Sequence, residues 1–256
     1  MRAIKFDMQF VITALRPEDL RPANPIKYNN KMYFLFLLIH LYCIGSLQFA
    51  FADHTQNSSY NFFQKLTGDD GGTDKNRWNK IYKKHKGYMF GKEPAQFLAQ
   101  NVSTLPIGKA LDIAMGEGRN AIFLAKKGFD VEGVDISEVA IQKAKRLARE
   151  NNVKIKTTIA DLNKYQIAPN TYDVIIVFYY LQRSLIPQIK QGLKPNGVVV
   201  FETNTVEQLK YDKTLNKSYL LEKEELKNFF KDFTFLKYAE TDDGKNAVAS
   251  LIARKP

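Results

Sequence analysis

The sequence contains a single cysteine, Cys43, and only three histidines among its 256 residues. One cysteine excludes a disulfide framework and a cysteine-rich zinc site, and it argues against a catalytic thiolate. The histidines, His40, His54 and His85, are too few and too scattered for a multi-histidine centre, so we expect no metal. A hydrophobic content of 45% over this length is enough to build a large core without such cross-links.

A concentrated basic surface is also lacking. The net charge is +11, but lysine and arginine nowhere form the dense stripe with interleaved aromatic residues that is typical of a nucleic-acid groove. The short run of Lys80, Lys83, Lys84 and Lys86 is interpreted as the solvated face of a helix. Nucleic acid is therefore disfavoured as a partner.

Charge is absent altogether from residues 32–52, which read MYFLFLLIHLYCIGSLQFAFA. Lys27 and Lys31 precede this run, and Ala50 to Ala52 form a small-x-small cleavage site, as in a secretory signal peptide. The run is also long enough to cross a bilayer as an uncleaved membrane anchor, and a buried core helix is the third alternative. We expect an exported or membrane-anchored protein in a periplasm or lumen, with the cytoplasm disfavoured.

This apolar segment divides the chain. Residues 1–31 form an N-terminal extension, which would not be translated if synthesis started near Met32. Residues 53–76 are polar and rich in glycine, as expected of a linker. Residues 77–256 are predicted to form the functional domain.

Strand-like and helix-like segments alternate in this last part. Regular alternation predicts a parallel sheet with helices on both faces, an α/β doubly wound fold, and ligands in such folds bind at the carboxyl ends of the strands. The expected strands are 109–114, 130–135, 154–160, 172–178, 198–202, 233–238 and 247–254, and the expected helices are 119–127, 137–151, 184–193 and 221–230.

The chemistry is concentrated in LDIAMGEGRN, residues 111–120, where a strand gives way to a helix. Gly116 and Gly118 would let a ligand approach the backbone and the start of the helix. Asp112 precedes this turn, where a carboxylate would repel a pyrophosphate but attract an ammonium group. The segment also lacks the G-x-G-x-x-G fingerprint of dinucleotide sites, so NAD is disfavoured.

Two further acids end neighbouring strands. Asp135 ends the second strand, where an acid can hold the hydroxyls of a ribose. Asp161 follows the third strand and could reach an adenine amino group, with Leu162 against the adenine face. Ammonium, ribose and adenine are the polar ends of S-adenosylmethionine, which we therefore predict as the cofactor.

These features resemble the class I S-adenosylmethionine-dependent methyltransferases, and more narrowly the branch that contains the tellurite-resistance enzymes. The resemblance implies a Rossmann-like sheet of seven strands with an antiparallel last strand, and a methyltransferase activity. Two positions depart from the pattern: Ala114 replaces the first signature glycine, and Tyr179 stands where relatives carry a smaller polar residue. The family resemblance rests on three segments, WNKIYKKHKGYMFGKEPAQFL (78–98), ALDIAMGEGRNAIFLAKKGFDVEGVDIS (110–137) and FYYLQRSLIPQIKQGLKPNGVVVFET (178–203).

The predicted site follows from these motifs, with no catalytic residue assigned. The expected reaction is methyl transfer to a small nucleophile such as a thiol or a metalloid oxyanion. The alternatives are methylation of RNA or protein, and a non-catalytic module that binds S-adenosylmethionine. The cofactor candidates are Asp112, Ala114, Gly116, Gly118, Asp135, Ile136, Asp161, Leu162 and Phe178, and the candidates for binding the acceptor are Tyr88, Tyr179, Arg183 and Glu202.

Overall fold

The structure, a computed structural model, describes residues 74–256. The predicted extension, the apolar segment 32–52 and most of the predicted linker lie outside these residues. None of the helices in the described part of the chain combines the length and the apolar character that a membrane crossing requires.

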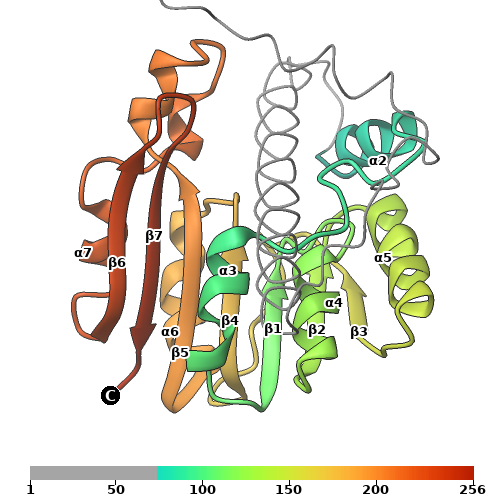
Figure 1. The fold of residues 1–256 in the computed structure, drawn as a ribbon, viewed down its shortest axis with the longest axis horizontal. Helices are drawn as coiled ribbons and strands as arrows, with labels where there is room; N and C mark the ends of the chain where they lie inside the picture. Colours follow the sequence, from blue (N-terminus) through green and yellow to red (C-terminus); the bar gives the residue numbers. More distant parts are fainter. Residues whose placement is uncertain (1–73) are drawn as a thin grey trace, which may run out of the picture. The chain divides into compact units, whose positions relative to one another are not determined.

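A seven-stranded sheet forms the centre of the domain (Figure 1), with the strand order β3-β2-β1-β4-β5-β7-β6. Strands β1 to β5 are parallel to one another, whereas β7 is antiparallel to both β5 and β6. The antiparallel last strand is thus confirmed. The strands are β1 (Lys109–Ile113), β2 (Asp130–Asp135), β3 (Lys156–Ile159), β4 (Tyr172–Phe178), β5 (Leu193–Asn204), β6 (Thr234–Asp242) and β7 (Ala247–Arg254).

The direction of β7 follows from a tight hairpin. In the loop between β6 and β7, the Asp243 carboxylate accepts hydrogen bonds from the amides of Lys245 and Asn246 at 2.9 and 2.7 Å. This Asx turn reverses the chain direction, so that β7 lies between β5 and β6.

The four predicted helices are present and differ from their predicted ranges mainly at the ends, but helices also form over residues 74–84 and 96–101, where none was predicted. The helix expected over 221–230 is shorter, and a helix begins at Asp74, ahead of the expected domain boundary at residue 77. Strand β5 is longer at both ends than the predicted 198–202. The helices are α2 (Asp74–Lys84), α3 (Gln96–Asn101), α4 (Arg119–Lys126), α5 (Glu138–Glu150), α6 (Ile186–Gly192) and α7 (Glu225–Phe229).

Helices cover both faces of the sheet, as the alternation predicts (Figure 1). On one face, Leu98 of α3, Leu124 of α4 and Ile141 of α5 belong to one buried cluster with alternate residues of the strands. On the other face, α6 and α7 contribute to a second cluster that contains Leu111 and Ile113 of β1. Because side chains alternate along a strand, Asp112 projects from β1 to the face covered by α3, α4 and α5.

Ser137 joins two elements that border the site described below. Its Oγ accepts a hydrogen bond from the Ala140 amide at 3.1 Å and so caps α5. The same hydroxyl donates to Oδ1 of Asn79 in α2 at 2.8 Å. The cap of α5 therefore also anchors α2.

We expect Ser137→Ala to lower the free energy of unfolding by about 1–2 kcal/mol, because the variant loses the helix cap and its bond to α2. Urea denaturation monitored by circular dichroism measures this change. Ser103→Ala, at an exposed position, is the matched control and should leave stability unchanged. Equal stabilities of the two variants would contradict the role given to Ser137.

Candidate functional site

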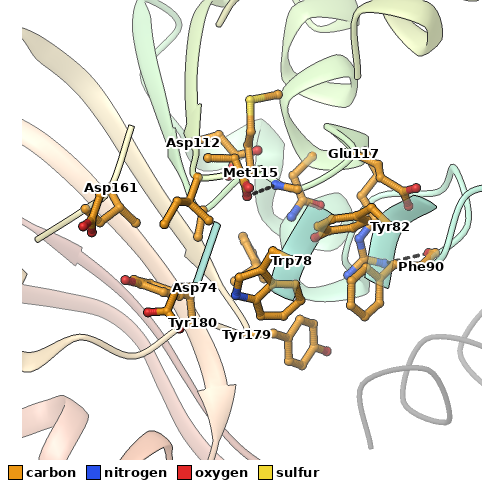
Figure 2. A pocket seen from close by; sticks show the side chains of 18 of the residues that line it. Asp74, Trp78, Tyr82, Phe90, Asp112, Met115, Glu117, Asp161, Tyr179 and Tyr180 are labelled. Atoms are coloured by element: carbon orange, nitrogen blue, oxygen red, sulfur yellow. Dashed lines mark hydrogen bonds between the residues drawn. The ribbon is translucent and has the colours of Figure 1, made fainter. Parts of the chain in front are cut away.

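A cavity lies at the carboxyl ends of β1 to β4 and is bordered by residues of α2 (Figure 2). Its empty volume is about 1040 Å³, counted out to its open mouth. This is the edge at which ligands bind in doubly wound sheets. The residues that line the cavity are Asp74, Trp78, Tyr82, Phe90, Gly91, Asp112, Ala114, Met115, Gly116, Glu117, Arg119, Asn120, Asp135, Ile136, Asp161, Leu162, Asn163, Phe178, Tyr179 and Tyr180.

Most of the residues predicted for the cofactor meet in this cavity. The exception is Gly118, whose φ of 83° lies in the left-handed region. A Cβ at Gly118 would lie 2.8 Å from side-chain atoms of Ala144 and Ile122. Gly118 therefore allows α4 and α5 to pack closely and does not line the cavity. The predicted cofactor residues that line it are Asp112, Ala114, Gly116, Asp135, Ile136, Asp161, Leu162 and Phe178.

Of the four residues predicted for the acceptor, Tyr179 alone lines the cavity. The Tyr88 hydroxyl accepts a hydrogen bond from Nε of Arg146 at 3.2 Å, outside the cavity. Arg183 forms a two-pronged ion pair with Glu225, at 2.7 and 2.9 Å, and so supports the start of α7. Glu202 lies behind Tyr179, whose hydroxyl donates to Glu202 Oε1 at 3.3 Å. Tyr88, Arg183 and Glu202 therefore do not line the cavity, and their role in binding the acceptor stays a prediction.

Helix α2 supplies cavity residues that the sequence analysis missed. Asp74, Trp78 and Tyr82 are four residues apart, a spacing that places them on one face of a helix. This spacing was visible in the sequence, but its first member lay within the predicted linker. Figure 2 shows these three side chains gathered around the cavity with Phe90 from the loop after α2.

Asp112 is almost completely buried, and its Oδ2 has no hydrogen-bond partner. Burial raises the pKa of the Asp112 carboxyl to about 8, although a hydrogen bond from the Ala121 amide opposes the shift. An unpartnered carboxylate oxygen in a buried position is costly for the free protein. It is therefore a strong candidate for contact with a cationic ligand group.

Asp135 is held by the glycine turn that it faces. Its Oδ2 accepts from the Gly116 amide and its Oδ1 from the Ser137 amide, both at 2.8 Å. Burial raises the pKa of Asp135 to about 6, while the amides of Ser137, Gly116 and Ile136 limit the shift. The carboxylate thus has a fixed orientation at the end of β2.

The backbone is strained at two positions in the cavity wall. Ala114 and Tyr179 both have a φ of 55°, in the left-handed region that non-glycine residues rarely adopt. Such a conformation costs about 1–2 kcal/mol per residue. Both residues directly follow strands, β1 and β4, so the strain lies where these strands turn toward the cavity.

A buried ion pair holds the segment after α2 against the cavity. Lys143 Nζ of α5 lies 2.7 Å from Glu117 Oε1 and donates to the carbonyls of Tyr82, His85 and Gly87, each at 2.8 Å. The second oxygen of Glu117 accepts from the Met89 amide at 2.6 Å. The two side chains are only 12% and 3% exposed. We call Lys143 and Glu117 the clamp.

The donor set of the cavity fits S-adenosylmethionine. The free oxygen of Asp112 suits an ammonium group, and the oriented carboxylate of Asp135 suits ribose hydroxyls. Gly116 provides a close backbone approach, since a Cβ there would lie 2.9 Å from the Tyr82 hydroxyl. Within residues 74–256, no group of histidine, cysteine and acidic side chains is arranged to hold a metal ion.

Comparison with known proteins decides the family. Residues 80–246 match the family model described as "Tellurite resistance protein TehB". The chain belongs to the TehB family. The domain has the class I methyltransferase fold, which it shares with the solved TehB structure described below.

Individual relatives agree with this assignment. The probable S-adenosyl-L-methionine-dependent methyltransferase TehB of Haemophilus influenzae is 32% identical over 57% of this chain and 57% of its own length. A ubiquinone biosynthesis O-methyltransferase of Pasteurella multocida is 33% identical over 42% of this chain and 50% of its own. The crystal structure of TehB from Haemophilus influenzae has a TM-score of 0.56 at 25% identity and covers 70% of this chain and 67% of that one. The chain thus spans little more than half the length of these curated relatives.

Loss of the clamp should destabilise this TehB-family domain. Lys143→Met leaves the Glu117 carboxylate buried without its cation, so we expect the free energy of unfolding to fall by about 3–5 kcal/mol. Lys145→Met, on an exposed position of the same helix, should change it by less than about 0.5 kcal/mol.

Adding Glu117→Gln to Lys143→Met should cost less than the sum of the two single changes, because the uncompensated charge is removed. Urea denaturation of the wild type, both single variants and the double variant measures the coupling. Additive effects would show that the two side chains do not act as a pair.

Asp112 should make stability depend on pH. Its folded-state pKa of about 8 lies above the ordinary value of 3.8, so folding takes up a proton between these values. The free energy of unfolding should therefore fall as pH rises from about 4 to about 8. Each pKa unit of difference corresponds to about 1.4 kcal/mol.

Asp112→Asn mimics the protonated acid. We expect it to match the wild type only below about pH 4, where the acid is protonated in both the folded and the unfolded state, and to exceed the wild type in stability by an amount that grows up to about pH 8, as measured by thermal or urea unfolding at each pH. Asp130→Asn, on an exposed site, should keep the slope of the wild type. Parallel pH profiles for the wild type and Asp112→Asn would refute the assignment.

Proposed function

We propose that this chain is an S-adenosylmethionine-dependent methyltransferase that acts on a small nucleophile, such as a thiol or a metalloid oxyanion. The observation that carries the proposal is the cavity at the ends of β1 to β4, with acids at three strand ends. The unpartnered oxygen of Asp112 lies at the first of these ends. Membership of the TehB family supports it as well.

When bound, S-adenosylmethionine supplies a methyl group activated by its sulfonium centre. The residues of the chain bind this cofactor and orient it. Asp112 takes the ammonium group, Asp135 the ribose hydroxyls, and Asp161 with Leu162 the adenine. Trp78 and Tyr82 of α2 cover the cavity and exclude water, so the reactants are brought together in a protected space.

The lining of the cavity favours a small acceptor. Phe178, Tyr179 and Tyr180 form an aromatic wall at the end of β4. No histidine or cysteine is among the described residues that line the cavity, so a nucleophile that ionises without a strong general base suits it best.

The names of the family and of a relative support a small acceptor. The family is named for tellurite resistance, and one relative is a ubiquinone biosynthesis O-methyltransferase. Methylation of RNA or protein has less support, because the described residues that line the cavity do not form a basic groove.

A screen for acceptors tests the function. The full chain is incubated with S-adenosylmethionine and, in turn, thiols, selenite, tellurite, halides and RNA, and the release of S-adenosylhomocysteine is measured. We expect turnover with at least one small nucleophile. Turnover with RNA alone would favour the macromolecular alternative, and binding without turnover would favour a non-catalytic module.

Asp135→Ala identifies the cofactor site within this screen. We expect the variant to bind S-adenosylhomocysteine more weakly by about 1.5–3 kcal/mol, the contribution of hydrogen bonds to a charged group. Asp130→Ala, at the exposed start of the same strand, should bind as the wild type does. Calorimetry that finds NAD binding and no S-adenosylhomocysteine binding would reject the proposal.

A further inference from the structure

Arg119 is a buried cation without an ion-pair partner in the described structure. It is the first residue of α4, and only 8% of it is exposed. Its Nη1 donates two long hydrogen bonds, to the carbonyls of Phe90 at 3.4 Å and Glu93 at 3.5 Å. The arginine ion pairs within residues 74–256 involve Arg77, Arg146 and Arg183, but not Arg119. Buried charges in proteins are normally paired, so this guanidinium has capacity for an anion.

Two aromatic rings fix the Arg119 guanidinium in the cavity wall. Its central carbon lies 5.7 Å from the centre of the Phe90 ring and 6.0 Å from that of Tyr179. Cation–π contacts of this kind hold a guanidinium in place but do not neutralise its charge. The other charged residues that line the cavity are acidic, so Arg119 is the cationic position among the described lining residues.

Asp112 is the natural counterpart of Arg119. Both residues line the same cavity, and each acts electrostatically on the pKa of the other, although burial has the larger effect on both. The two side chains nevertheless form no ion pair, and the Asp112 Oδ2 atom has no partner at all. It is unfavourable to bury a guanidinium and an unpartnered carboxyl group apart from each other unless a ligand pairs with both. A group that carries an ammonium and a carboxylate together would do so.

We propose that Arg119 binds the α-carboxylate of a zwitterionic amino-acid group whose ammonium is bound by Asp112. This inference rests on the proposed function, in which the methionine end of S-adenosylmethionine is that group. It assigns the anion-binding position of the cavity to the cofactor. The acceptor therefore does not need a negative charge of its own to bind.

A matched pair of ligands isolates the carboxylate. Decarboxylated S-adenosylmethionine differs from S-adenosylmethionine only in this group and retains the ammonium. We expect the wild-type chain to prefer S-adenosylmethionine by about 10- to 100-fold in Kd, measured by calorimetry. Arg119→Gln should abolish the preference by weakening S-adenosylmethionine alone. Arg149→Gln, on an exposed position of α5, should keep the preference of the wild type.

A third ligand reports whether the Arg119→Gln site remains folded. 5′-Methylthioadenosine lacks the amino-acid end, so the wild type and Arg119→Gln should bind it equally. Equal affinity of the wild type for S-adenosylmethionine and its decarboxylated form would overturn the inference, whatever the variant does. It would also be overturned if Arg119→Gln kept the preference, or if this variant raised only the KM for an anionic acceptor. A wild type that bound none of the three ligands would instead reject the proposed function.

Discussion

The cavity depends on the buried ion pair between Lys143 and Glu117. These two side chains connect α5, the glycine turn and the segment between Tyr82 and Met89 through charge-assisted hydrogen bonds. Without this constraint, α2 would be held chiefly by the Ser137–Asn79 bond and by the contacts of Trp78, Ile81 and Tyr82. The clamp thus holds the polar helix α2 against the aromatic-lined cavity. Its value comes from geometry, because a buried pair gains little net stability over an apolar one.

The cavity itself is built at a cost in stability. Asp112 and Asp135 are buried acids with raised pKa values, and Ala114 and Tyr179 adopt strained backbone conformations. All four lie at or next to the carboxyl ends of parallel strands, at the same edge of the sheet. The hydrophobic burial in the large apolar clusters on both faces of the sheet offsets this loss of stability. Concentrated strain and unpaired charge are expected where a ligand completes the structure.

This arrangement suits catalysis by positioning. A TehB-family domain with an activated cofactor needs accurate placement and the exclusion of water more than a strong base. The aromatic rings of Phe90 and Tyr179 have two roles, because they form part of the cavity wall and also hold the Arg119 guanidinium. Behind Tyr179, Glu202 and Ser250 continue the support through hydrogen bonds of 3.3 and 2.6 Å. Residues outside the cavity thereby influence its shape.

The sequence by itself determined the order of strands and helices and the acids at the ends of β1, β2 and β3. Strand periodicity and glycine turns are local signals, and parallel strands bring their carboxyl ends to one edge. Only the tertiary structure decided which side chains join them. Arg183 was predicted to line the pocket, but in the structure it forms an ion pair with Glu225. Gly118 was predicted to contact the cofactor, but in the structure it allows two helices to pack closely. The roles of Asp74, Arg119 and Lys143 depend on contacts with segments that are distant in the sequence. Local sequence patterns do not predict such contacts.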